Sequence, residues 1–131
     1  MPKAAKRKTA TTRKPLAMRD WTLMVYLAGD NNLSDAGAVD LKEMKKVGSG
    51  DRINVVAQYD RAGHRIQTMR YYLRPRTPLT ADVVQSIGET NMGDPAVLED
   101  FVAWATTHYP ARRYMLVLWN HGAGWDDANI Y

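Results

Sequence analysis

The chain has 131 residues, 45% of them hydrophobic, which suffices for one domain with a hydrophobic core. It contains no cysteine, which excludes disulfides and thiolate metal sites, and no run near the ~20 apolar residues that a membrane-spanning helix requires. The net charge of +4 divides into +7 in residues 1–19 and −3 in the remainder, so we expect a soluble, mildly acidic folded part with no membrane partner.

Residues 1–19 form a basic segment of mainly Lys, Arg, Thr, Ala and Pro without an acidic residue. Such a segment buries too little apolar surface to offset its ordering entropy, so we expect a disordered tail. It lacks the apolar core of a secretory signal, which makes the cytoplasm the default location and leaves export open. A solubilising or targeting role is favoured over binding of nucleic acid or an anionic surface.

The first predicted strand, residues 21–28 (WTLMVYLA), is almost entirely apolar, which is typical of a buried strand. Ser34 is the expected N-cap of the following helix. One face of this helix carries apolar residues at three-residue intervals: Ala38, Leu41, Met44 and Val47. Gly48 and Gly50 are expected to end the helix.

The second predicted strand, residues 53–59 (INVVAQY), is another buried apolar run. A loop at residues 61–65 leads to residues 66–73, which we expect to form an antiparallel strand at an edge of the sheet. Residues 80–90 connect this strand to the next helix and show no pattern that assigns them a structure.

The second predicted helix begins at Asp94 and Pro95, which suit the N-cap and the first turn. Its apolar face consists of Leu98, Phe101, Val102 and Ala105. Pro110 follows the helix, and residues 114–119 form the third predicted strand. Its apolar run at residues 115–119 suits a parallel strand that is covered on both faces.

The order strand, helix, strand, hairpin, helix, strand predicts an α/β fold. We expect about three parallel strands, one antiparallel edge strand and flanking helices. The chain then divides into a tail at residues 1–19 and one folded region at residues 20–131.

Polar residues follow each of the three parallel strands. They are Asp30, Asn31 and Asn32, then Asp60 and Arg61, then Asn120, His121 and Gly122. Because sites in open parallel sheets form beyond the carboxyl ends of the strands, we expect a site at this edge. The His121 imidazole suits proton transfer near neutral pH, and the alternative is a structural histidine that is hydrogen-bonded in a turn.

Metal sites are poorly supported. His64 and His108 are expected to be solvated surface residues, and no pair of histidines has the spacing of a zinc site. The first three ligand positions of a calcium loop are matched by Asp30, Asn32 and Ser34. Later positions lack the required glycine and glutamate, so an EF-hand is excluded while a looser calcium site stays open.

Three blocks of the sequence resemble the clostripain family of cysteine endopeptidases. They are residues 21–33 (WTLMVYLAGDNNL), 88–104 (GETNMGDPAVLEDFVAW) and 116–125 (LVLWNHGAGW). The resemblance extends in unbroken order from about residue 20 to residue 125. It implies a caspase-like, three-layer α/β fold, cleavage of peptide or protein substrates after arginine or lysine, and calcium as a candidate structural ion.

The resemblance also implies roles for individual residues. His121 corresponds to the histidine of a Cys–His dyad, in which a thiolate attacks the scissile carbonyl and the imidazole passes a proton to the leaving amine. The Gly122 backbone N–H corresponds to a donor to the developing oxyanion. Asp30, Asn31 and Asn32 would border the cleft in a structural or substrate-positioning role.

The sequence departs from the family in one respect. The family nucleophile lies on the strand after the histidine strand, and residue 131 precedes that strand. We therefore expect the chain alone to be inactive. Its sheet would end at the apolar strand 115–119, whose free backbone groups favour association with a segment that carries the missing cysteine. The chain is then a light-chain-like piece or the product of a truncated reading frame.

Two other interpretations stay open. The chain could be a non-catalytic, caspase-like binding module or pseudoenzyme that keeps the fold without the nucleophile. Alternatively, it could associate with nucleic acid through its basic tail, with an affinity that falls steeply as salt rises.

Overall fold

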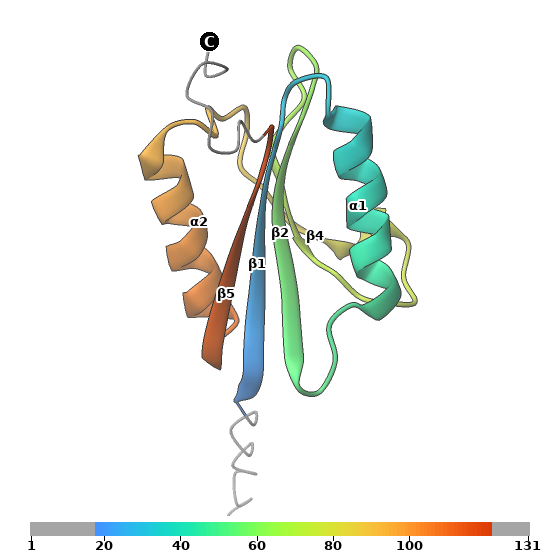
Figure 1. The fold of residues 1–131 in the computed structure, drawn as a ribbon, viewed down its shortest axis with the longest axis vertical. Coiled ribbons are helices and arrows are strands. Elements are labelled where there is room, and N and C mark those ends of the chain that lie inside the picture. The colour runs from blue at the N-terminus through green and yellow to red at the C-terminus, as the bar shows by residue number, and fades with distance from the viewer. Residues whose placement is uncertain (1–17, 122–131) are drawn as a thin grey trace, which may run out of the picture.

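The computed structural model describes residues 18–121 as one mixed sheet with a helix on each face (Figure 1). β1 (Arg19–Gly29) lies between β2 (Ile53–Arg61) and β5 (Ala111–Trp119), and both neighbours run parallel to it. β3 (Met69–Tyr72) and β4 (Val83–Ser86) extend the sheet beyond β2 in antiparallel pairs. The strand order is β4-β3-β2-β1-β5, so the expected α/β fold with three parallel strands is confirmed.

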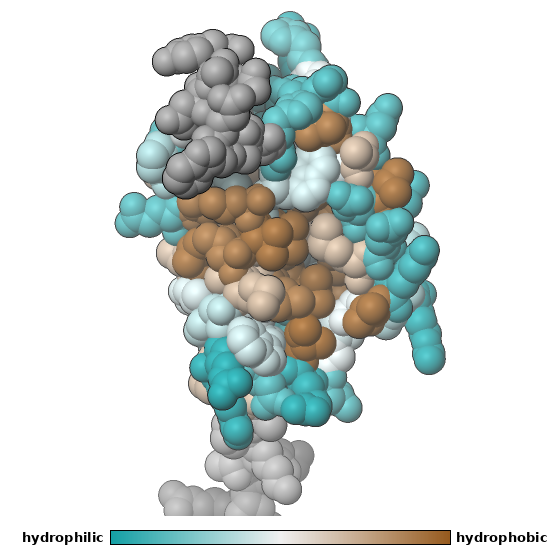
Figure 2. All heavy atoms as spheres, in the orientation of Figure 1, coloured by the Kyte–Doolittle hydropathy of each residue, from teal (hydrophilic) through white to brown (hydrophobic). Residues whose placement is uncertain are grey.

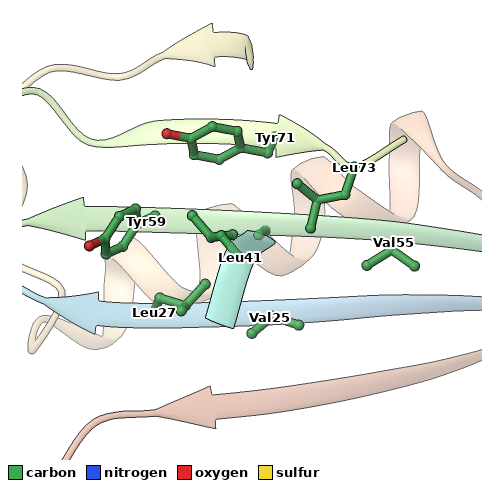
Figure 3. Packing of buried hydrophobic residues seen from close by; sticks show 8 residues of the cluster. Val25, Leu27, Leu41, Val55, Tyr59, Tyr71 and Leu73 are labelled. Atoms are coloured by element: carbon green, nitrogen blue, oxygen red, sulfur yellow. The ribbon is translucent and has the colours of Figure 1, made fainter. Parts of the chain in front are cut away.

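α1 (Ser34–Val47) covers one face of the sheet. Successive side chains of a strand point to opposite faces, so alternate residues of β1 and β2 face this helix. Leu41 of α1 is completely buried among them, and Figure 3 shows the strand residues that surround it. This core cluster contains Val25, Leu27, Leu41, Val55, Ala57, Tyr59, Tyr71 and Leu73.

α2 (Pro95–His108) covers the opposite face, where the other set of strand residues is buried. The Asp94 carboxylate accepts a hydrogen bond from the Ala96 N–H at 2.9 Å, which confirms the predicted N-cap. Phe101 and Ala105 have no exposed surface, and Leu98 and Val102 pack beside them, so the predicted apolar face is also confirmed.

The beginning of α1 differs from the prediction. Leu33 precedes the helix and no side chain caps it. Ser34 is the first helical residue, and its hydroxyl instead accepts a hydrogen bond from the Ala62 N–H at 3.0 Å. At the other end, Gly48 adopts a φ of 63° and closes the last turn as predicted, but Val47 is 78% exposed and lies outside the buried face.

The antiparallel part of the sheet is larger than predicted. β3 begins only at Met69, and it is not an edge strand because β4 pairs with its other side. β4 falls within the segment whose structure the sequence left unassigned. Its four residues (VVQS) show no alternation of apolar and polar residues that could have predicted a strand, and three of them are exposed.

A buried ion pair fixes the turn before β4. Asp82 is 1% exposed and forms salt bridges with Lys45 of α1 and with Arg74, the latter at 3.0 Å. The Thr77 hydroxyl donates to the same carboxylate at 2.5 Å. Burial alone would raise the pKa of Asp82, but these hydrogen bonds outweigh burial and the pKa is lowered.

β5 is parallel to β1 as predicted, but the prediction that both of its faces are covered is wrong. Its side chains from residue 112 to residue 118 are all exposed. α1 packs against β1 and β2, and α2 packs against β1, so β5 extends beyond the helices. Trp119 at its end is the exception, because its indole N–H donates to Asp40 of α1 at 2.8 Å.

No helix in the described part of the chain is both long and apolar enough to span a bilayer. β1 begins at Arg19, the last residue that the sequence assigned to the tail. Residues 1–17 of that tail and the predicted oxyanion donor Gly122 lie outside the described residues.

Candidate active site

The carboxyl ends of β1 and β5 are joined by one side chain. The amide group of Asn31, two residues after β1, donates at 3.0 Å both to the Ala28 carbonyl and to the Asn120 side-chain oxygen. Its own oxygen accepts from the Leu33 N–H at 2.8 Å. Asn31 therefore fixes the loop after β1 and links it to the residue that precedes His121.

His121 lies at this junction and is exposed to solvent. Its backbone N–H donates to the Asn120 side-chain oxygen at 2.7 Å. Its ring Nε2 lies 2.5 Å from Oδ1 of Asn32. The imidazole is thus held from both the backbone and the ring, and it is accessible to a reacting group.

A close contact under the loop sets where α1 begins. A Cβ atom on Gly29 would lie 2.8 Å from the Tyr59 ring, and one on Gly37 would lie 2.9 Å from the same ring. The Tyr59 hydroxyl donates to the Ser34 carbonyl. Glycine is therefore needed at both positions for the loop and the first turn of α1 to pack against β2, a constraint that sequence analysis missed.

A polar cavity of about 200 Å³ lies beside this loop. It is lined by Ala28, Asp30, Asn31, Asp60, Thr90, Asn91, Met92, Gly93 and Asn120. Asp60 is only 4% exposed, and its burial, aided by the negative charges of Asp30 and Glu89, raises its pKa. The sequence predicted Asp60 at this edge of the sheet but not its burial.

The structure brings some of the predicted site residues together. Asn31, Asn32 and His121 form one hydrogen-bonded group. Asp30 lines the polar cavity and forms no hydrogen bond with the ring among the described residues. Arg61 is exposed at the end of β2. His64 and His108 are exposed, as predicted.

The calcium-loop pattern does not correspond to a set of free ligands. The side-chain oxygen of Asn32 contacts His121, and that of Ser34 accepts from Ala62. Within residues 18–121, no three histidine or acidic side chains converge as a metal site would require. A structural calcium ion stays a prediction that rests on the family resemblance alone.

Exposed apolar side chains on β5 lie on both faces of this edge strand next to the site, and together we call them the β5 apolar surface. It consists of Tyr114, Met115, Leu116, Val117 and Leu118, which are 39–63% exposed. Figure 2 shows an apolar patch over the region that β5 occupies in Figure 1. An entirely apolar groove of about 410 Å³ adjoins it, lined by residues that include Val47, Val117 and Trp119. Contiguous apolar surface of this kind is typical of an interaction site.

Comparison with known sequences identifies relatives of this chain. Residues 25–131 match the model of the Clostripain family. Clostripain from Hathewaya histolytica is 30% identical over 144 aligned residues, which cover 83% of this chain and 27% of that protein. The chain therefore spans about a quarter of the length of the curated relative.

Solved structures give the same result. A secreted C11 cysteine protease from Bacteroides thetaiotaomicron, in complex with an irreversible peptide inhibitor, matches with a TM-score of 0.66 and 30% identity over 82% of this chain and 31% of that chain. An inactive zymogen C11 protease from Parabacteroides distasonis matches with a TM-score of 0.61 and 27% identity, over 87% and 34%. A B. fragilis cysteine protease chain, 24% identical, has a TM-score of 0.66 over 82% of this chain and 92% of its own length.

The sheet order, the two helices and these matches define an α/β chain with the caspase-like fold of C11 cysteine proteases, of which it comprises an incomplete part. The chain belongs to the Clostripain family.

Proposed function

We propose that this chain supplies the catalytic histidine, His121, of a clostripain-type cysteine endopeptidase that cleaves after arginine or lysine. The observation that carries this proposal is the position of the exposed imidazole, at the carboxyl end of a strand whose outer edge is uncovered in the described residues. None of the 131 residues is a cysteine, so the nucleophile has to come from another segment.

The proposed chemistry is acyl transfer to a cysteine. The thiolate attacks the scissile carbonyl carbon, and the imidazolium of His121 gives its proton to the leaving amine. The neutral imidazole then takes a proton from the water that hydrolyses the thioester. A positioned acid–base group of this kind typically contributes about 10²- to 10⁴-fold to the rate. The Gly122 N–H is the proposed donor to the oxyanion, worth roughly 2.7–4 kcal/mol.

The proposed partner is a segment that adds a parallel strand to β5. Two features of β5 support it: a backbone edge without a neighbouring strand in residues 18–121, and the β5 apolar surface, which such a segment would bury. This chain also covers 92% of the B. fragilis cysteine protease chain, so a polypeptide of this extent forms a separate chain in that structure.

The experiment mixes this chain with a polypeptide that carries the following strand and its cysteine, taken from a clostripain relative. We expect the mixture to cleave a peptide after arginine and each component alone to be inactive. His121→Ala should lower the rate at least about 100-fold, because the leaving amine then lacks its acid. The matched control is His108→Ala, which removes an exposed histidine beside the beginning of β5, the end opposite to His121, and should leave the rate unchanged.

The decisive result is the rate of the His121→Ala mixture once complex formation has been verified by gel filtration. If that complex cleaves as fast as the unmodified one, His121 has no catalytic role.

The second candidate is a non-catalytic binding module. The observation that favours it is the combination of a chain without cysteine and an apolar strand that can accept a partner whether or not the partner carries a nucleophile. It predicts a tight complex with no cleavage, with an affinity that His121→Ala leaves unchanged and Leu118→Asp weakens.

A further inference from the structure

The contact between Asn32 and His121 determines which nitrogen of the neutral His121 ring carries the proton. Nε2 lies 2.5 Å from the amide oxygen Oδ1, and the two residues are 89 positions apart in the chain. An amide oxygen can only accept a hydrogen bond, so Nε2 is the donor. A neutral imidazole carries one N–H, so Nδ1 then carries the free lone pair and is the basic nitrogen.

Both sides of this contact are anchored independently of it. The loop that carries Asn32 is fixed by the Asn31 side chain, which bonds to Ala28 and Leu33. The backbone of His121 is fixed by Asn120. The geometry therefore does not depend on the Asn32 contact itself, which is what a side chain that orients another requires.

The contact also directs the ring. Asn32 follows β1, which is the inner neighbour of β5, so Nε2 is bonded to the β1 side of the site. Nδ1 is separated from Nε2 by Cε1, so its lone pair points in a different direction from the Asn32 contact, and it forms no hydrogen bond with any residue from 18 to 121. The proposed cysteine strand would add to the outer edge of β5, on the side away from β1.

We infer that Asn32 is a positioning residue that holds the proton of neutral His121 on Nε2 and thereby presents Nδ1 as the base. When Nδ1 takes a proton, the Nε2–H bond becomes charge-assisted and Asn32 stabilises the imidazolium. Its catalytic consequence rests on the proposed function, whereas the tautomer does not.

The tautomer is measured by NMR on the full chain with ¹⁵N-labelled histidine, at a pH about two units above the usual histidine pKa of 6.5, where the rings are neutral. We expect His121 to carry its proton on Nε2. His108 provides an internal reference, because its Nδ1 lies 2.8 Å from the Trp104 carbonyl and must donate to it. The two histidines should therefore show opposite tautomers in one spectrum.

Two variants separate the amide oxygen from the amide nitrogen. Asn32→Asp keeps an acceptor and removes the donor, so the Nε2–H tautomer of His121 should persist. Asn32→Ala removes the acceptor, and His121 should become a mixture of both tautomers, while His108 stays unchanged as the control. The inference is overturned if unmodified His121 carries its proton on Nδ1, or if Asn32→Ala leaves its tautomer populations as they were.

Activity in the mixed complex then tests the catalytic consequence. Asn32→Ala should lower kcat by about 10- to 100-fold with little change in KM, because the misdirected ring affects the chemical step more than binding. The expected tautomers in a complex without activity would contradict the protease function but not the Asn32 contact. Full activity of Asn32→Ala would overturn the positioning role while leaving the protease function intact.

Discussion

β2 and β5 are the two neighbours of β1, and their environments are opposite. Both have nine residues, run parallel to β1 and are rich in apolar side chains. Residues 54–60 of β2 are all buried, whereas residues 112–118 of β5 are all exposed. The difference arises because α1 packs on β2 and β3 pairs with its outer edge, while the helices pack chiefly on β1 and β2 and reach β5 mainly at Trp119.

This comparison separates two things that an apolar run is often taken to predict together: that the segment is a strand, and that the same chain buries it. The run at β5 correctly indicates a strand, and it indicates the environment that the strand requires. It does not show that the same chain provides that environment. The exposure of this apolar strand among residues 18–121 is therefore the basis of the proposed partner.

The largest expected effect comes from placing one charge on each strand. Val56→Asp buries an unpaired carboxylate at a fully buried position of β2 and should cost more than about 4 kcal/mol of the free energy of unfolding. Val117→Asp, the matched substitution on β5 at a 39% exposed position, should cost less than about 1.5 kcal/mol. Urea denaturation of both variants measures the difference.

Val117→Asp also tests the mixed complex. It should weaken binding of the proposed partner segment, because the partner would desolvate the introduced carboxylate. Equal losses of stability in the two isolated variants would contradict the view that β5 is uncovered.

The next largest loss of unfolding free energy is expected at the buried Lys45–Asp82 ion pair. Asp82→Ala leaves the buried Lys45 ammonium without its carboxylate and should cost about 3–5 kcal/mol. The matched control is Arg52→Ala, which breaks the exposed pair with Asp20 and should change the free energy of unfolding very little.

The pH dependence of this effect has a definite sign. Burial of Asp82 is outweighed by its hydrogen bonds, so its pKa is lower in the folded protein than in the unfolded chain. The stability it contributes is present above the unfolded value near 3.9 and is lost as pH falls through the folded value. Below about pH 4 the unmodified chain should therefore lose stability more steeply than Asp82→Ala. Parallel pH profiles of the two proteins would contradict this assignment.

The smallest change in the free energy of unfolding is expected for a substitution at Asp60. Its pKa is raised, chiefly by burial, so the folded state binds the proton more tightly and loses stability as pH rises through the raised pKa. Asp60→Asn should therefore increase the free energy of unfolding at pH 7, by about 1 kcal/mol or less. The change should vanish near pH 3, where both states of the unmodified chain are protonated. Thermal unfolding at both values tests this, and a destabilised variant at pH 7 would refute it.

Much of the fold could be predicted from local patterns. The three parallel strands have long apolar runs, and α2 has both an N-cap and an apolar face. β4 could not be predicted because its four residues carry no alternation, and its position depends on the distant Lys45–Asp82 pair. Ser34 has the chemistry of an N-cap, but a neighbouring loop uses its hydroxyl.

The site was predicted only at the level of loops. Chain order and the rule for parallel strands correctly bring Asn31 and Asn32 near His121. They do not specify which side chain bonds to which atom, because that depends on the backbone path of the loop, which packs Gly29 closely against the Tyr59 ring. Gly122, whose role the family resemblance implied, lies outside the described residues.

The hydrogen bond between the Trp119 indole and Asp40 has a consequence for assembly. It attaches the last residue of β5 to α1, the helix that packs on β1 and β2. The proposed partner segment would thus meet a His121 ring whose position is already fixed, and little conformational freedom would remain to be lost there when it binds.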